Sequence, residues 1–183
     1  MNKTKIKTTD LTSIALMTAI TAIMAQITIP MPLGVPMTMQ TFAVTLAAVV
    51  LGSKRGSISM IIYLLLGIAG VPVFAGFRGG VQCVAGPTAG FLISFPIMAL
   101  IIGLGVKYYK DKKWLFWIFL TVGTISNYII GTAIFCLIMK APLATGITAC
   151  VIPFIPTAII KAILGSIIGF QVRKRLQISV AWN

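Results

Sequence analysis

The sequence predicts an all-α, polytopic membrane protein with six transmembrane helices. Apolar residues make up 58% of its 183 residues and charged residues only 9%, so too little polar surface exists to cover a water-soluble domain. The apolar residues gather into six runs, each bounded by proline, glycine or charge. The basic residues, which bring the net charge to +13, cluster at the ends of these runs.

The six runs predict the helices of a single membrane domain covering residues 1–183. They lie at about 11–29, 39–52, 57–70, 87–105, 114–139 and 153–172. The first run follows three lysines, as in a signal peptide. It is 19 uncharged residues long, however, which exceeds the apolar core of such a peptide. We therefore expect a helix that is retained.

The basic residues predict the orientation. With the N-terminus in the cytoplasm, 12 of the 15 bases fall on the cytoplasmic side: Lys3, Lys5, Lys7, Lys54, Arg55, Lys107, Lys110, Lys112, Lys113, Arg173, Lys174 and Arg175. Cytoplasmic loops of membrane proteins carry such an excess, so we expect both termini inside and a multi-pass location in the cell membrane. Topology thus accounts for the positive charge. We expect membrane lipid around the chain and no nucleic-acid partner.

The second and third runs are short. About 14 residues of helix span roughly 21 Å, less than the ~30 Å hydrocarbon core. Lys54 and Arg55 predict a tight cytoplasmic turn between these runs, so the missing depth lies on the outer side. There the loops at 30–38 and 71–86 must fill it, and irregular backbone at that depth is tolerated only within protein or around a cavity. The sequence therefore predicts a polar-lined, outward-opening cavity beneath two loops.

The loop at 71–86 is rich in glycine and proline, which exclude a continuous helix. Phe74 and Phe77 alternate with glycines, and Arg78 is the only charge. Apolar surface, exposed backbone N–H groups and one cation would suit a small, partly apolar anion. The alternative is a connection that only reverses the chain.

Three polar residues within or beside the apolar runs are candidates for a binding site. Lys161 lies ~16 Å and Asn127 ~20 Å from the inner face, counted along their helices, so their depths nearly coincide. Gln40 opens the second run below the first loop. Each has an alternative role: Lys161 could extend to the outer interface, Asn127 could bond another helix, and Gln40 could cap or be solvated.

Several chemistries lack the residues they need. The chain has no histidine, and its two carboxylates, Asp10 and Asp111, lie at the cytoplasmic ends of helices. We therefore expect no enzyme, no catalytic residues, no cofactor and no metal site. The sequence also contains no G-x-x-x-x-G-K-[ST] motif for ATP. Uphill transport would need energy from another polypeptide.

The first run contains a small-residue stripe, Ala15 and Ala19, which would let another helix approach closely. The more economical interpretation is packing within the chain; the alternative is a partner subunit.

Four segments, together with the six-span layout, resemble the BioY family of biotin-specific substrate-binding (S) components of energy-coupling factor (ECF) transporters. They are VPMTMQT (35–41), GIAGVPVFAG (67–76), GGVQCVAGPTAGFL (79–92) and PFIPTAIIKA (153–162), and the likeness covers nearly the whole chain. The resemblance implies an ECF S-component fold with biotin bound on the extracellular side and 30–38 as a lid. It also implies docking on a module of a transmembrane coupling subunit and two ATPases. Ala15 and Ala19 would then face the coupling subunit, which replaces the internal interpretation.

The hypothesis is high-affinity biotin binding by Gln40, Phe74, Phe77, Arg78, Asn127 and Lys161, with either cation taking the carboxylate. The alternatives are an S component for another small anionic vitamin, or a structural or channel subunit without a ligand. Two departures from the family pattern stand out. Ala158 occupies the position, three residues before Lys161, where the family usually has an acid. Phe77 and Arg78 replace a more glycine-rich stretch.

Overall fold

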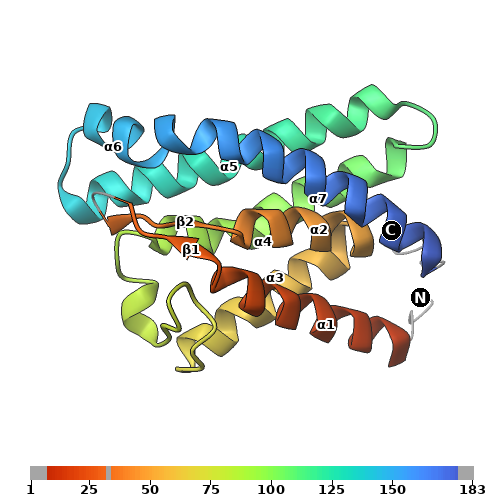
Figure 1. Ribbon diagram of the computed structural model, residues 1–183, viewed down its shortest axis with the longest axis horizontal. Coiled ribbons are helices and arrows are strands. Elements are labelled where there is room, and N and C mark those ends of the chain that lie inside the picture. Colours follow the sequence, from red (N-terminus) through yellow and green to blue (C-terminus); the bar gives the residue numbers. More distant parts are fainter. Residues whose placement is uncertain (1–7, 32–33, 177–183) are drawn as a thin grey trace, which may run out of the picture.

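The structure is a computed structural model that describes residues 8–31 and 34–176. Its elements form an elongated bundle of helices (Figure 1). In chain order they are α1 (Thr8–Ala25), β1 (Thr28–Ile29), β2 (Met37–Thr38), α2 (Gln40–Leu51), α3 (Ser53–Ile68), η2 (Val81–Cys83), α4 (Ala89–Gly105), η3 (Val106–Tyr108), α5 (Lys113–Met139), α6 (Leu143–Cys150), η4 (Ile152–Phe154) and α7 (Ile155–Arg175).

The predicted class, a helical membrane protein, is confirmed. Four described helical segments are long and apolar enough to cross a membrane: Thr8–Ala25, Ala89–Tyr108, Lys113–Met139 and Leu143–Arg175. The shorter α2 and α3 have 12 and 16 residues, or about 18 and 24 Å of helix. The six-span count and the cytoplasmic placement of both termini stay predictions, and Lys3, Lys5 and Lys7 lie outside the described residues.

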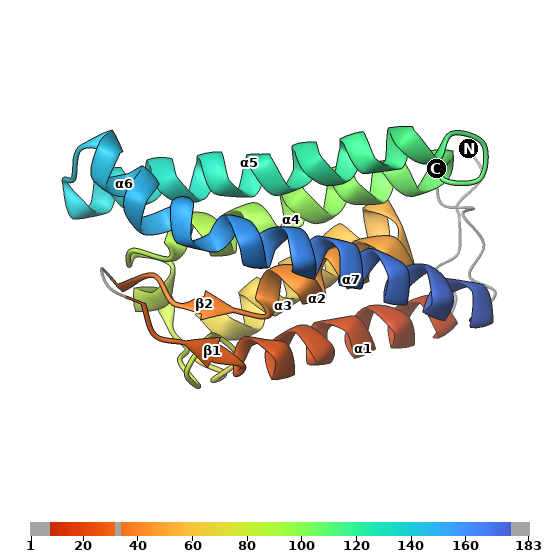
Figure 2. The same ribbon diagram turned by 45° about the horizontal axis from the view of Figure 1, so that its top comes forward.

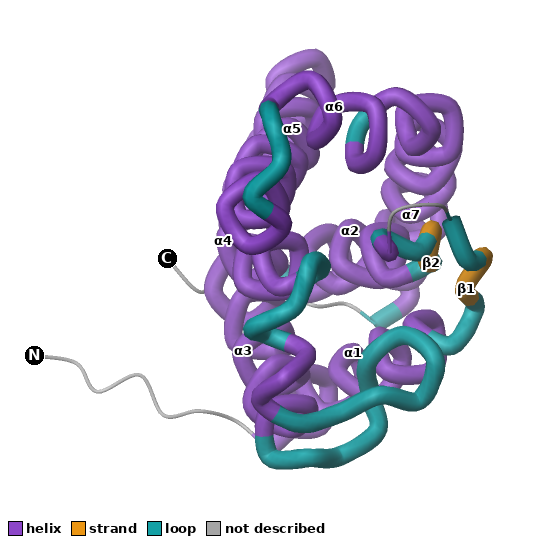
Figure 3. Tube along the Cα trace, turned by 90° about the vertical axis from the view of Figure 1, so that its left-hand side faces the viewer, coloured by secondary structure: helices purple, strands orange, loops and turns teal. Residues whose placement is uncertain are grey.

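The bundle has two distinct ends (Figures 1 and 2). The start of α1 and the end of α7 lie together at one end, which we call the terminal end. The two strands, the loop at 71–86 and α6 lie at the other, which we call the loop end; Figure 3 views the molecule from that side.

The first predicted helix, 11–29, extends too far. α1 ends at Ala25, and Thr28–Ile29 pairs antiparallel with Met37–Thr38. Pro30 cannot continue a helix, and the β-branched residues before it favour extended backbone. Within the predicted lid, 30–38, residues Met37–Thr38 form the second strand of this pair, just before α2.

The predicted turn at Lys54 and Arg55 is wrong. Both residues lie in the first turn of α3, which starts at Ser53 instead of 57. The reversal is made by Gly52 alone, whose φ of 82° is in the left-handed region that favours glycine. Gly103 of α4 packs so closely on this turn that a Cβ there would meet the backbone of Ser53.

The connection predicted between 139 and 153 contains a helix that the sequence analysis missed. Lys140 ends α5 in the left-handed conformation, with a φ of 49°. Pro142 then precedes the eight residues of α6. α6 packs on α5 and closes the loop end. Proline just before a helix was the available signal.

Helix α2 is the centre of the bundle. Eleven of its 12 residues are buried, because α1, α3, α4 and α7 all pack around it. Small residues permit this. Gly56 of α3 lies against Ala48, and Gly165 of α7 lies against Thr45 and the carbonyl of Phe42. This explains how a short apolar helix fits inside the protein instead of facing lipid.

Charged side chains join the helices at the terminal end. Arg55 of α3 pairs with Asp10 of α1 at 3.1 Å. Arg173 of α7 donates from Nη1 to the carbonyls of Val49 and Val50, each at 2.9 Å, and so satisfies two carbonyls at the end of α2. These bases stabilise the fold in addition to any effect on orientation.

Candidate functional site: a cavity beneath two loops

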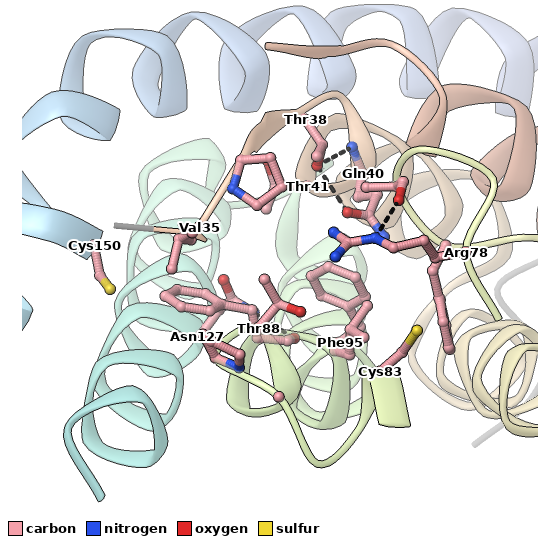
Figure 4. Close-up of a pocket in the computed structure, with 18 of the residues that line it drawn as sticks. Val35, Thr38, Gln40, Thr41, Arg78, Cys83, Thr88, Phe95, Asn127 and Cys150 are labelled. Atoms are coloured by element: carbon pink, nitrogen blue, oxygen red, sulfur yellow. Dashed lines mark hydrogen bonds between the residues drawn. The ribbon is translucent and has the colours of Figure 1, made fainter. Parts of the chain in front are cut away.

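A cavity of about 480 Å³ lies at the loop end. Its wall comes from residues 34–38, the start of α2, the loop at 71–86, and elements α4 to α7 (Figure 4). The predicted cavity beneath two loops is thereby confirmed. All six candidate residues line it: Gln40, Phe74, Phe77, Arg78, Asn127 and Lys161. The structure therefore brings together residues that span more than 120 positions of the sequence.

Lys161 is buried at 7% exposure and projects from α7 into the cavity. Its Nζ donates to the carbonyl of Thr38, in β2, at 3.0 Å. The alternative that it extends to the outer interface is therefore wrong. An ammonium group carries three donors, so two remain for a ligand. No carboxylate pairs with it in the described part of the chain.

Ala158, three residues before Lys161, lines a different hollow. That hollow lies between α5, α6 and α7 and is almost entirely apolar. Ala158 therefore borders a hollow other than the cavity that Lys161 lines.

Asn127 of α5 is 1% exposed, and its amide orientation follows from its partners. Nδ2 donates to the carbonyl of Phe91 at 3.1 Å and to Oγ of Ser94 at 2.7 Å, both in α4. Both interpretations of Asn127 thus have a basis: its nitrogen joins two helices, and its residue borders the cavity. The carbonyl Oδ1 accepts no hydrogen bond from any described residue, so it remains an acceptor for a donor on a ligand.

Both amide atoms of Gln40 make hydrogen bonds within the protein, which the sequence did not predict. Its Oε1 accepts from Oγ1 of Thr38 at 2.8 Å, and its Nε2 donates to the hydroxyl of Tyr63 at 2.7 Å (Figure 4 shows the first contact). The Tyr63 hydroxyl in turn donates to the carbonyl of Val73 at 2.9 Å. Gln40 therefore links the hairpin strand to the second loop.

Tyr63, on α3, was missed by the sequence analysis. It is fully buried, and its ring packs edge-on against Phe74 with 5.4 Å between centroids. The only signal was a hydroxyl within a short apolar run. Such a hydroxyl needs a partner, but the sequence does not tell which.

Residues 74–78 of the second loop form a tight turn beside the cavity. Phe74 is buried at 2% exposure, above Gly67, where any Cβ would clash with its ring. Backbone bonds join Phe74 and Arg78 in both directions, at 2.9 and 3.3 Å. Nε of Arg78 donates to the carbonyl of Ala75 at 3.0 Å, which leaves the terminal nitrogens of the guanidinium group for the cavity. Phe77 is 71% exposed and lies at the rim.

Four further aromatic side chains line the cavity and were also missed. Phe91 and Phe95 come from α4, Tyr128 from α5 and Phe154 from η4. Phe91 and Tyr128 meet edge-on, with 6.4 Å between centroids. The site combines aromatic side chains with two cations and the amide acceptor of Asn127, which suits an anionic ligand with an apolar body and N–H donors.

The sequence model of the BioY family matches residues 1–178. This chain belongs to the BioY family. Among its relatives, biotin transporter BioY2 of Lactococcus lactis subsp. cremoris is 36% identical over 91% of each chain. The biotin transporter BioY of Thermotoga maritima is 36% identical over 80% of this chain and 86% of that one. A probable biotin transporter BioY of Pyrococcus horikoshii is 48% identical, over 54% of this chain and 60% of its own length.

A solved structure supports the same assignment. The crystal structure of the S-component for biotin from an ECF-type ABC transporter superposes with a TM-score of 0.84, at 29% identity, over 93% of this chain and 95% of that chain. This BioY-family chain therefore has the S-component fold, and the resemblance seen in its four segments is confirmed.

Proposed function

We propose that this chain is the biotin-binding S component of an ECF-type ABC transporter and mediates biotin uptake across the cell membrane. One observation carries the proposal: Lys161, Arg78 and the Oδ1 of Asn127, which accepts from no described residue, border one cavity of about 480 Å³ that aromatic side chains help to line. That volume lies within the ~300–1,000 Å³ of small-molecule sites. Membership of the BioY family supports biotin as the occupant.

The chemistry of biotin matches this set of groups. Its ureido ring carries N–H donors and a carbonyl acceptor, and its valerate chain ends in a carboxylate. We place a ureido N–H at Oδ1 of Asn127 and the ureido oxygen at Nζ of Lys161. The rings and chain contact Phe74, Phe77 and the α4 aromatics. The carboxylate then reaches Arg78, whose exposed guanidinium lies at the opening.

The energy for uptake comes, in this proposal, from an ECF module of a transmembrane coupling subunit and two ATPases. The chain itself contains no P-loop motif. Ala15 and Ala19 are exposed, whereas α1 packs into the bundle through its opposite face, with Ile14, Met17 and Thr21. The exposure of the stripe supports a partner-facing role over packing within the chain.

Equilibrium dialysis of labelled biotin against the purified protein tests the binding function. Saturable binding is expected, with other anionic vitamins as competitors in parallel. Absence of saturable binding contradicts the proposal in favour of a subunit without a ligand. Stronger competition by another vitamin identifies an S component of different specificity.

Ala15→Trp tests the partner surface. A bulky side chain on the exposed stripe is expected to abolish co-purification with ATPase-bearing subunits while biotin affinity stays within about twofold, because the stripe lies on α1 outside the cavity wall. Leu137→Trp, exposed on α5 and away from this stripe, is the control for added bulk. Retained association of Ala15→Trp would exclude this stripe as the docking surface.

A further inference from the structure

We infer that Gln26, just after α1, is a positioning residue that holds the turn from Phe74 to Arg78 where its side chains can line the cavity. The effect of this clamp on biotin binding rests on the proposed function. The clamp itself, a contact between Gln26 and the turn, does not depend on which ligand binds. Gln26 itself is absent from the cavity wall and acts through the loop.

The Gln26 amide contacts both sides of the turn. Its Oε1 accepts from the backbone N–H of Phe77 at 2.8 Å. Its Nε2 donates toward the carbonyls of Phe74 and Val73, at 3.3 and 3.4 Å, and is anchored to α1 by the carbonyl of Ala22 at 2.9 Å. The side chain of Gln26, just after α1, therefore holds the loop from the side away from the cavity wall.

The turn needs such an external partner. Gly76 and Phe77 have positive φ angles, 71° and 55°, and a residue with a side chain rarely adopts that conformation unless its surroundings impose it. The backbone bonds between Phe74 and Arg78 leave the N–H of Phe77 without a backbone acceptor among the described residues. Gln26 supplies the acceptor at the strained residue itself.

The position of Arg78 depends on the same turn. Its Nε is bonded to the carbonyl of Ala75, inside the turn, so the guanidinium group moves with the backbone of that turn. Phe74 is anchored independently, because its ring is held by Tyr63 and Gly67. Loss of Gln26 should therefore free Phe77, leave Arg78 held only by its two backbone bonds to Phe74 and its bond to Ala75, and leave Phe74 in place.

A ligand-free measurement tests the clamp. Arg78 and Lys140 are both exposed sites for trypsin, so the rate of cleavage after Arg78 relative to Lys140 reports the mobility of the turn within one molecule. Gln26→Met, which keeps the length but removes both hydrogen-bonding groups, is expected to raise this ratio about fivefold. Thr12→Val, on the same helix, is the control, because Thr12 bonds only to its own helix.

Gln26→Glu keeps an acceptor for the Phe77 N–H and is expected to give an intermediate ratio. It also serves as the test should Gln26→Met fail to accumulate in the membrane. A ratio equal to that of the unmodified protein in the folded variants would overturn the clamp.

A double-mutant cycle on biotin affinity tests the link to the ligand. Arg78→Ala is expected to weaken binding about tenfold in the unmodified protein but less than threefold in the Gln26→Met background, because the turn that carries the guanidinium is no longer held by Gln26. Additive losses would mean that Gln26 only stabilises the fold and would overturn the positioning role. If the unmodified protein binds no biotin, the proposed function fails while the trypsin ratio still decides whether the clamp exists.

Discussion

The two ends of the bundle use cations in different ways. At the terminal end, Arg55 pairs with Asp10 and Arg173 donates to two carbonyls of α2. At the loop end, Lys161 donates one hydrogen bond to the carbonyl of Thr38, and Arg78 donates one to the carbonyl of Ala75. Their remaining donors have no partner among the described residues.

This difference separates stability from binding. A cation whose contacts are made within the chain stabilises the helix packing. A cation that keeps donors beside a cavity can give them to a ligand. Variants at the loop end should therefore mainly lower the affinity for biotin, and variants at the terminal end should mainly lower the free energy of unfolding.

The largest expected effect is on affinity at the loop end. Lys161→Ala removes a buried ammonium from the cavity, which should weaken biotin binding by about 30-fold or more, corresponding to ~2–5 kcal/mol. Expression should be retained, since only the bond to Thr38 is lost from the fold. The measurement is equilibrium dialysis, with Lys140→Ala, an exposed lysine, as the control. Unchanged affinity would remove Lys161 from the site.

The opposite pattern is expected at the terminal end. Arg173→Ala leaves the carbonyls of Val49 and Val50 without their donor, which should cost about 1.5–3 kcal/mol of stability. Biotin affinity should stay within about twofold, because Arg173 is at the far end of α7 from the cavity. Thermal unfolding in detergent checks the first result, with exposed Arg175→Ala as the control. A parallel fall in affinity would show that the two ends are coupled.

The smallest effect should come from the link between the two loops. Tyr63→Phe keeps the ring against Phe74 but removes the hydroxyl between Gln40 and Val73. Both affinity and stability should fall by about 1 kcal/mol, or about fivefold in the dissociation constant. Calorimetric titration and thermal unfolding measure the two quantities. An effect on stability alone would exclude the link from ligand binding.

Much of the site could be predicted because membrane burial limits the choices. Depth along a helix follows from residue counting, so Lys161 and Asn127 could be placed at one level. A buried cation or amide in an apolar span needs a partner, which made both of them candidates. The glycine-rich composition around Arg78 likewise predicted a loop near the opening.

Other features depended on contacts that no local pattern encodes. Gln40 carries an amide group that could bind a ligand, yet this amide is hydrogen-bonded to Thr38 and Tyr63. Gln26 was not a candidate in the sequence, because its loop partners are about 50 positions away. Hydrogen-bond partners at that separation are set by helix packing.

The sequence by itself determined the class of protein, the apolar segments and the type of chemistry, because the bilayer requires long apolar helices and makes every buried polar residue costly. Only the tertiary structure decided that α2 is enclosed by its neighbours, that Gly52 makes the turn, and which polar atoms remain free for a ligand. The reason is physical. Hydropathy depends on composition along the chain, whereas a donor or acceptor is used or free according to which distant groups approach within hydrogen-bonding distance.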